Sequence, residues 1–246
     1  MPIASGVGSH VKKRTAMKYA SFNNKKTKAK DVVSGAIGKD LWFRDYDVIA
    51  CVGKYRQYWK YIGDKPDLPN GYEPETDWHA AWKGSLIDDA CEVICGANRE
   101  HRADIKTNGF VIEIQKCRID GWAVIERNRF YKELTGQRLI WIVNVEDAWK
   151  NKRISTSLDS SAKDGRFIIK WKYAWKWVEE MAITNDTYLY LDFNPLNDKL
   201  IYTWKHDNIT FGKWVNKVDF FDKYLKEVAK PDFSENGRFM ELFKDI

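Results

Sequence analysis

The chain has 246 residues, 44% of them hydrophobic, which is enough for one sizeable core and a small appended domain. No apolar run approaches the roughly 20 residues that a membrane span needs, and the first residues lack the basic start and apolar centre of a signal peptide. The sequence therefore predicts a cytoplasmic protein with no membrane partner. The cysteines lack metal-ligand spacing, and Cys91 and Cys95 would share a helical face, so reduced thiols are expected and zinc is not.

Positive charge is concentrated at the start of the chain. Residues 1–30 carry eight basic side chains and no acidic one, whereas the net charge of the whole chain is +6, so the remainder sums to −2. Because this segment lacks apolar periodicity, it predicts a flexible basic arm. Two roles stay open: an arm that contacts DNA phosphates, for example through Lys12, Lys13 and Arg14, or a solvated tail with no role.

Residues 31–72 predict a small β-rich subdomain followed by a linker. Residues 40–52 have strand character, and residues 56–62 mix aromatic with basic side chains. These aromatic residues suit either stacking on nucleic-acid bases or packing in a small core. The stretch over residues 64–74 is rich in turn-forming residues, which predicts the linker.

A helix is expected over residues 76–95. At about 100° per residue, His79 lies on the stripe that faces the sheet, and Lys83 lies at its margin. His79 is either a packed core residue or a group that orients the attacking water or touches a phosphate, and Lys83 would neutralise developing charge. Glu75, just before the helix, is either a metal ligand or a favourable anion at a helix start.

The pattern with the most chemical content spans residues 102–115. Two strands joined by a turn at residues 107–109 would bring Asp104 beside Glu113, and Gln115 would share the face of Glu113. Two carboxylates beside an amide form a hard-oxygen site suited to Mg²⁺ or Mn²⁺. Such a site can generate hydroxide and stabilise an in-line phosphoryl displacement. This is the outline of an Asp…Glu-x-Lys nuclease site, with Gln115 in the position of the lysine.

Two further elements complete an α/β pattern. A helix is expected over residues 120–135 between Asp120 and Gly136, and residues 138–144 predict a buried strand. The order helix, strand, strand, helix, strand over residues 73–150 predicts a restriction-endonuclease-like core, in which helices flank a mixed sheet.

Two arginines belong to these elements and have two interpretations each. Arg102 shares the face of Asp104, and Arg127 lies four residues before Tyr131 on the predicted helix. Either arginine would bind a DNA phosphate or simply pair with a nearby carboxylate.

Four short motifs follow one another in this region. They are Glu100-His-Arg-Ala-Asp-Ile, Ile112-Glu-Ile-Gln-Lys, Glu126-Arg-Asn-Arg-Phe-Tyr131 and Ile140-Trp-Ile. With the upstream pattern His79-x-x-x-Lys83, they resemble the competence-protein CoiA-like nucleases over residues 75–145. The resemblance implies a Mg²⁺-dependent DNA nuclease, and the glutamine of the Glu-x-Gln motif is usual in that family.

Residues 151–246 predict a separate C-terminal extension rich in β-strands. Strands are expected at residues 188–193 and 199–204, and a short helix at residues 217–228. Trp171 and Lys172 belong to an alternation of bulky and basic residues that runs from Phe167 to Trp177. That alternation is either a strip that stacks bases and contacts phosphates or a half-buried strand whose lysines extend to solvent.

Three classes of function remain open. The favoured one is a Mg²⁺-dependent DNA nuclease centred on Asp104, Glu113 and Gln115. The second is a non-catalytic DNA-binding protein with the same fold, and the third is a metal-dependent hydrolase of a small molecule. DNA is the expected partner, and a homodimer is one alternative for the oligomeric state.

Overall fold

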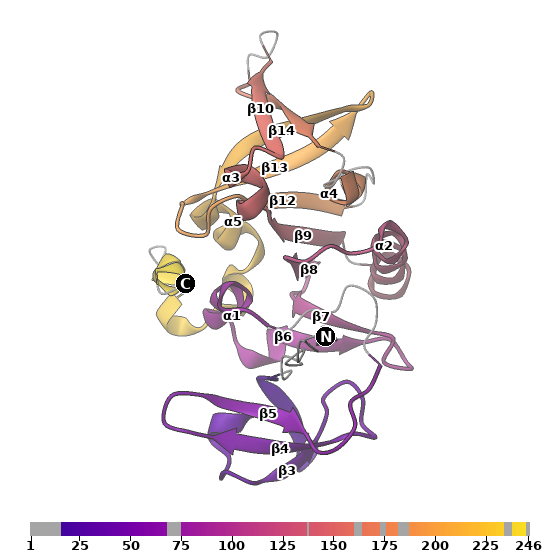
Figure 1. The fold of residues 1–246 in the computed structure, drawn as a ribbon, viewed down its shortest axis with the longest axis vertical. Coiled ribbons are helices and arrows are strands. Elements are labelled where there is room, and N and C mark those ends of the chain that lie inside the picture. Colours follow the sequence, from indigo (N-terminus) through magenta and orange to yellow (C-terminus); the bar gives the residue numbers. More distant parts are fainter. Residues whose placement is uncertain are drawn as a thin grey trace, which may run out of the picture. The chain divides into compact units, whose positions relative to one another are not determined.

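The computed structural model describes residues 16–67, 75–136, 138–159, 164–172, 176–181, 187–233 and 238–244 (Figure 1). Two compact units divide the chain, unit 1 over Met1–Asp67 and unit 2 over Leu68–Ile246. Each unit has its own β-sheet, and the α-helices of the described residues belong to unit 2, so the protein is of the mixed α/β class. Within those ranges, no helix combines the length and apolar character that crossing a lipid bilayer requires.

Unit 1 is a five-stranded antiparallel sheet with strand order β2-β1-β3-β4-β5. Its strands are β1 (Tyr19–Phe22), β2 (Lys25–Lys28), β3 (Ile37–Lys39), β4 (Asp47–Val52) and β5 (Gln57–Tyr61), with the short 3-10 helix η1 (Ala29–Asp31) after β2. Trp59 is fully buried at the centre of a small apolar core. A backbone bridge between Met17 and Trp59 ties the segment before β1 to β5, at the far end of the sheet.

The start of unit 1 corrects the prediction of a flexible arm over residues 1–30. Residues 16–30 include β1 and β2, so the N-terminal subdomain begins before residue 31. Asn23 and Asn24 have φ angles of 51° and 60°, as a two-residue hairpin turn requires. Because β2 is polar along its whole length, apolar periodicity could not reveal it, and pairing with β1 supplies its stability.

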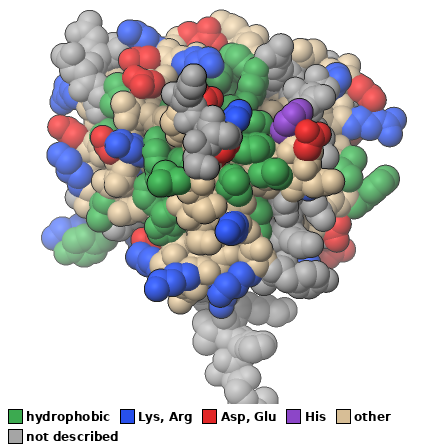
Figure 2. All heavy atoms as spheres, turned by 90° about the horizontal axis from the view of Figure 1, so that it is seen from above, with side chains coloured by type: hydrophobic (Ala, Val, Ile, Leu, Met, Phe, Trp, Pro, Cys, Tyr) green, Lys and Arg blue, Asp and Glu red, His purple; other side chains and the backbone are tan. Residues whose placement is uncertain are grey.

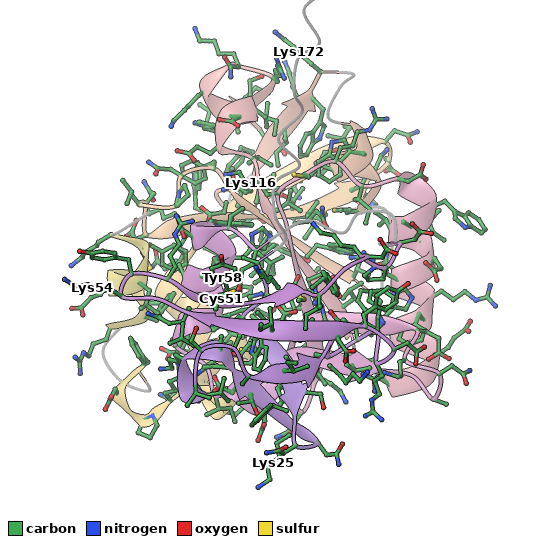
Figure 3. The ribbon with its side chains drawn as sticks, turned by 60° about the horizontal axis from the view of Figure 1, so that its bottom comes forward. Lys25, Cys51, Lys54, Tyr58, Lys116 and Lys172 are labelled. Atoms are coloured by element: carbon green, nitrogen blue, oxygen red, sulfur yellow. The ribbon has the colours of Figure 1, made fainter. Side chains whose placement is uncertain are left out.

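Unit 1 carries the whole positive surplus of the chain. Met1–Asp67 holds 14 Lys and Arg against 6 Asp, whereas Leu68–Ile246 holds 27 basic against 29 acidic residues. Lys25 at the start of β2 and Lys54 in the turn after β4 both point away from the sheet (Figure 3). The described part of unit 1 is therefore a folded basic module rather than a tail.

Unit 2 is built on a nine-stranded sheet with order β10-β11-β14-β13-β12-β9-β8-β7-β6. The central strands β8, β9 and β12 are parallel to one another, and the flanking pairs are antiparallel. The strands are β6 (Cys91–Cys95), β7 (His101–Lys106), β8 (Phe110–Gln115), β9 (Arg138–Asn144), β10 (Ile154–Leu158), β11 (Phe167–Trp171), β12 (Thr187–Asp192), β13 (Lys199–His206) and β14 (Ile209–Asn216).

Helices lie on both sides of this sheet (Figure 1). On one side, α2 (Gly121–Thr135) and α4 (Lys176–Met181) bury apolar side chains in the main core of the unit. On the other side lie α1 (Asp77–Gly84) and α5 (Lys217–Tyr224), with ring centroids of Trp82 and Phe220 separated by 5.6 Å. The remaining helices are α3 (Glu146–Lys150), η2 (Asp88–Ala90), η4 (Lys226–Val228), η5 (Pro231–Phe233) and η6 (Arg238–Phe243).

Several predicted elements of unit 2 are confirmed. Strands β7 and β8 flank the expected turn, and β9 coincides with the predicted buried strand. Helix α2 begins after Asp120, whose carboxylate accepts a hydrogen bond of 2.8 Å from the backbone N–H of Trp122. It ends at Gly136, which adopts the left-handed conformation with φ of 64°.

Two other predictions for unit 2 are wrong. The helix expected over residues 76–95 ends at Gly84, and Cys91 and Cys95 lie on strand β6 instead of a helical face. A short apolar run does not distinguish a buried strand from a buried helix by its periodicity. Residues 151–246 are not a separate extension either, because β10 to β14 continue the sheet that contains β6 to β9.

Candidate active site

The N-terminus of α1 is fixed to the central sheet by His79. The backbone N–H of Thr76 donates to Nδ1 of His79 at 3.3 Å, and the backbone N–H of His79 faces the Thr76 hydroxyl at 3.5 Å, which together form a capping box. The other ring nitrogen, Nε2, lies 3.1 Å from the backbone carbonyl of Ile114 on β8. His79 is 3% exposed. These contacts favour a positioning role for His79 over direct contact with water or phosphate.

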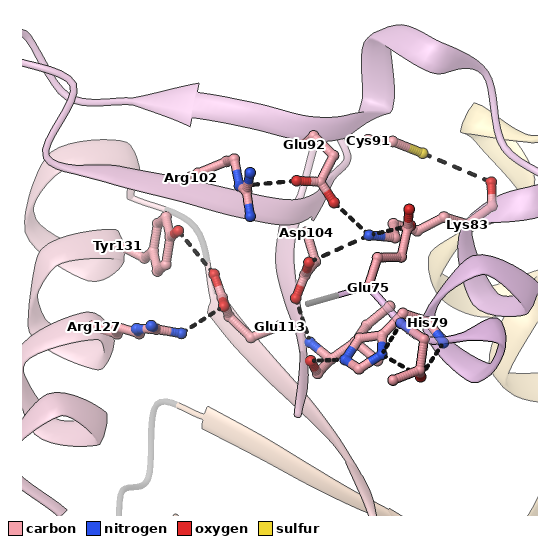
Figure 4. Close-up of polar contacts among 12 residues, drawn as sticks. Glu75, His79, Lys83, Cys91, Glu92, Arg102, Asp104, Glu113, Arg127 and Tyr131 are labelled. Atoms are coloured by element: carbon pink, nitrogen blue, oxygen red, sulfur yellow. Dashed lines mark hydrogen bonds and ion pairs between the residues drawn. The ribbon is translucent and has the colours of Figure 1, made fainter. Parts of the chain in front are cut away.

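Lys83, one turn further along α1, is the centre of a carboxylate cluster (Figure 4). Its ammonium group lies 2.8 Å from Oε1 of Glu75 and 3.6 Å from Oδ1 of Asp104, and it forms a short ion pair with Glu92. Burial alone would lower the pKa of this ammonium, but the carboxylates of Glu92, Glu75 and Asp104 outweigh burial and hold the pKa well above its ordinary value. Lys83 therefore stays charged.

Glu92 is the member of this cluster that the sequence did not indicate. It lies on β6 between Cys91 and Val93, which pair with Ile105 and Ala103 of β7, so its position is opposite Asp104. Its φ angle is 50°. A left-handed conformation is rare for a residue other than glycine within a strand, and such outliers concentrate at functional sites. The Glu92 carboxylate faces Lys83 and also forms an ion pair with Arg102, whose Nε lies 2.9 Å from Oε2 of Glu92. Because residue 92 was expected to lie within a helix, its position beside Lys83 and Arg102 was not predicted.

Asp104 joins the cluster to strand β8. Its Oδ2 accepts a hydrogen bond of 2.9 Å from the backbone N–H of Ile114, while Oδ1 faces Lys83. Ile105 of β7 pairs with Ile112 of β8. Because the strands are antiparallel, the residue before Ile105, Asp104, and the residue after Ile112, Glu113, occupy the neighbouring position on the two strands. The structure thus places the two predicted carboxylates on adjacent strands, as expected.

Glu113 points toward α2 rather than toward Lys83 (Figure 4). Arg127 donates to its Oε2 at 2.9 Å, and the hydroxyl of Tyr131 donates to its Oε1 at 2.9 Å. Burial raises the pKa of Glu113 to about 7 despite the opposing effect of Arg127, and the nearby charge of Asp104 acts in the same direction as burial. Burial and the same carboxylate also raise the pKa of Tyr131. Glu113 is therefore a carboxyl group that titrates near neutrality.

The other predicted site residues make different contacts or lie on other elements. The side-chain amide of the buried Gln115 donates to the backbone carbonyl of Cys117 at 2.8 Å. Trp171 is half-buried against the main core, whereas Lys172 is exposed and points away from the ribbon (Figure 3). Trp177, the other end of the predicted stacking strip, is buried and is not available for bases. Lys12, Lys13 and Arg14 lie outside the described residues.

The charge balance of the cluster favours the uptake of a cation or a proton. Four carboxylates meet three cationic groups, which leaves one negative charge in excess; the carboxylates are Glu75, Glu92, Asp104 and Glu113, and the cations are Lys83, Arg102 and Arg127. A carboxylate offers about four lone-pair positions, so the contacts above leave capacity for a further ligand. Surplus negative charge and hard oxygen donors both fit a divalent cation such as Mg²⁺.

The cluster fits a cation that takes only some of its ligands from protein side chains. Among the described residues, no three His, Cys, Asp or Glu side chains converge as a ready metal site. Mg²⁺ is commonly held by one or two carboxylates, with water and substrate phosphate oxygens as its other ligands. Asp104 and Glu113 are the two carboxylates that such an ion would use here.

The chain was compared with known proteins at three levels. No protein-family model, no curated protein sequence and no solved structure matches it. The geometry and chemistry of the cluster are therefore the basis on which a function is assigned.

Proposed function

We propose that the protein is a metal-dependent DNA nuclease that hydrolyses phosphodiester bonds at the Asp104 and Glu113 carboxylates. The observation that carries the proposal is the net negative cluster in which these carboxylates occupy adjacent strands, beside the buried Lys83 and the half-buried Arg127. The resemblance of residues 75–145 to CoiA-like nucleases, and with it a restriction-endonuclease-like core, agrees with this function. Mg²⁺ or Mn²⁺ is the proposed cofactor.

Several side chains in and beside the cluster have a role in this proposal. A divalent cation held by Asp104 and Glu113 would supply a Lewis acid and a water of lowered pKa. Lys83 stays charged and stabilises negative charge that develops on a phosphate. Arg127 sets the orientation of Glu113, and His79 fixes α1, and hence Lys83, against β8. Gln115 supports the end of β8 through its bond to Cys117.

DNA is the proposed partner because of the charge of unit 1. This unit has a surplus of eight positive charges, which suits sequence-independent contact with phosphates. Lys172, exposed after β11, and Arg102, at the edge of the cluster, are further candidates for phosphate contact.

A second function is favoured by one observation, namely that every carboxylate of the cluster already faces a cation of the chain. If Arg127 and Lys83 permanently replace a metal ion, the protein binds DNA without cleaving it. The two functions differ in a direct assay with divalent cations.

The test is incubation with linear, circular and single-stranded DNA in Mg²⁺, Mn²⁺ or EDTA. We expect cleavage only with a divalent cation, and a loss of about 100-fold or more in Asp104→Asn and Glu113→Gln, since even outer-shell partners of a metal cost about 10–100-fold. Glu133→Gln is the matched control, because Glu133 pairs with Arg129 on the exposed face of α2.

A second measurement separates the alternatives. Mn²⁺ should raise the melting temperature of the wild type, because an ion that binds only the folded state stabilises it, and Asp104→Asn should abolish this shift. Absence of cleavage for every DNA form, together with no shift by Mn²⁺, would establish the non-catalytic function instead.

A further inference from the structure

A row of aromatic side chains lies on one face of the β13–β14 hairpin in unit 2. Trp204 pairs directly with Phe211, and Tyr202 precedes Trp204 by two residues, so all three rings lie on the same face. The ring centroids of Tyr202 and Trp204 are 5.5 Å apart with an interplanar angle of 25°, and those of Trp204 and Phe211 are 5.9 Å apart with an angle of 23°. The three rings therefore form an offset-stacked row, in which neighbouring rings overlap only in part.

This surface is accessible at its Trp204 end. Tyr202, Trp204 and Phe211 are each half-buried, whereas Ile201 on the opposite face of β13 is fully buried in the main core. Among the described residues, α5 packs over the other end of the face, where Phe220 contacts Tyr190 with centroids 4.7 Å apart. The view from above Figure 1, toward the β10 and β14 end, shows exposed hydrophobic side chains with both basic and acidic side chains around them (Figure 2).

Basic side chains border the aromatic row. Lys213 pairs directly with Tyr202, and Lys170 lies two residues after Ile168, which pairs with Phe211, so both exposed lysines share this face. The Arg166 guanidinium lies 5.2 Å from the centroid of the Phe211 ring, but its charge is already paired with Asp159 at 3.0 Å. None of the residues that β11, β13 and β14 place on this face is acidic, although unit 2 as a whole has more acidic than basic residues.

We propose that this aromatic face, formed by Tyr202, Trp204 and Phe211 with Lys170 and Lys213, binds single-stranded nucleic acid. Aromatic side chains stack on unpaired bases without regard to sequence, and flanking lysines contact the backbone phosphates. Paired bases in a duplex do not expose their ring faces, so the surface selects unpaired strands. The inference rests on the proposed function only in taking nucleic acid as the class of partner.

The test measures binding of a labelled oligothymidylate of about 16 nucleotides, the upper end of the usual site size, by fluorescence anisotropy in EDTA. An oligouridylate and a duplex of the same length distinguish DNA from RNA and single from double strands. Trp204→Leu should weaken binding of the single strand about tenfold or more, the expected effect of losing one stacked base, and should leave duplex binding unchanged. Trp204→Phe keeps a ring and should retain most of the affinity.

Trp214→Leu is the matched control, because Trp214 is 40% exposed on the same hairpin but on its opposite face. Its affinity for the single strand should stay at the wild-type level. Cross-linking with an oligonucleotide that carries 5-iodouracil should map to peptides containing Tyr202, Trp204 or Phe211. The proposal is overturned if Trp204→Leu binds like the wild type, if Trp214→Leu loses as much affinity, or if duplex binding falls equally.

Replacing the lysines of the aromatic face tests the phosphate contacts separately from the stacking of bases. Replacing Lys170 and Lys213 by alanine should flatten the dependence of log affinity on log salt by about 0.7 for each phosphate of the single strand that is no longer neutralised. Lys199→Ala, on the opposite face of β13, should leave the slope unchanged. Because these measurements use EDTA, they do not depend on cleavage, and their failure is distinguishable from failure of the proposed nuclease function.

Discussion

At the scale of single residues, burial and ion pairing act on Glu113 in opposite directions. Burial raises its pKa to about 7, above the ordinary value, even though Arg127 donates to it. A raised pKa in the folded state means that the protonated form is favoured there. The contribution of Glu113 to the free energy of unfolding is therefore fully present below pH 4.5 and is lost as the pH rises to about 7, with an upper limit of about 3 kcal/mol.

Glu113→Gln should remove this dependence. The free energy of unfolding of the variant, measured by denaturant titration at several pH values, should change less than that of the wild type between pH 5 and pH 8. The ion pair with Arg127 forms only when Glu113 is ionised, so its effect is already part of the titration of Glu113, and the slope is the readout. Equal slopes for the two proteins would contradict the assignment.

Lys83 offers the complementary test, because its removal leaves carboxylates without their shared cation. Lys83→Met should lower the free energy of unfolding by about 3–5 kcal/mol, the usual cost of breaking a buried ion pair on one side. Lys150→Met is the control, since Lys150 pairs with Glu146 on the surface, and its melting temperature should change little. Similar melting temperatures for both variants would show that the Lys83 cluster is not coupled to folding.

The pair of carboxylates was predictable, and the cluster around Lys83 was not. Asp104 and Glu113 flank a local hairpin whose alternation and turn are visible in the sequence, so their proximity follows from a few residues. Glu92 enters the site through the pairing of β6 with β7 and through a left-handed backbone conformation. Neither property has a local sequence signal, because Glu is not a residue that usually adopts positive φ.

At the scale of elements, the short helix α1 depends on its first turn. Thr76 caps the helix, and its contacts with His79 hold the ring that reaches Ile114. Thr76→Ala should lower stability by about 1 kcal/mol, the typical cost of losing such a cap, whereas Thr76→Ser keeps the hydroxyl and should match the wild type. Thermal unfolding gives the comparison, and identical values for Ala and Ser would rule out a capping role.

The elements that were predicted correctly are those with strong end signals. Helix α2 has a capping Asp120 and a terminating Gly136, and both act as expected. The segment after α1 has cysteine, valine and isoleucine in close succession, which fit a helix or a strand equally well by pattern. Its assignment to β6 depends on a partner strand, β7, that no local rule identifies.

At the scale of the whole molecule, the boundaries of the two units give a prediction about truncation. Removing residues 1–30 deletes β1 and β2 and uncovers Trp59, so unit 1 should unfold. Removing residues 1–15 keeps both strands and should leave the unit folded. Limited proteolysis should digest residues 31–67 rapidly only in the longer deletion, and protection of this segment in both proteins would contradict the fold of unit 1.

The shorter deletion also tests the basic residues at the start of the chain. It removes Lys12, Lys13 and Arg14, and each phosphate contact that they make contributes about 0.9 to the slope of log affinity against log salt on duplex DNA. A flatter slope in a folded protein assigns DNA contacts to these residues. An unchanged slope assigns the contacts to the described basic residues of unit 1.

The extent of unit 2 could not be predicted from local patterns. Strand β12 pairs with β9 in parallel register although more than 40 residues separate Asn144 from Thr187 along the chain. Such a pairing needs a crossover connection. Here the connection includes β10 and β11, which pair with each other and form the edge of the same sheet opposite β6. The polar stretch that follows residue 150 therefore belongs to a connection within one sheet and does not mark a domain boundary.

The left-handed residue in β6 has one more consequence, which concerns association between molecules. β6 is the last strand at its end of the nine-stranded sheet in the described part of the chain. An outer strand with a straight row of free N–H and C=O groups invites pairing with a strand of another molecule, and this is a common start of aggregation. The turn of the backbone at Glu92 interrupts that row and places a charged residue at the interruption. The conformation that directs a carboxylate toward Lys83 thus also makes the outer strand a poor template for edge-to-edge assembly.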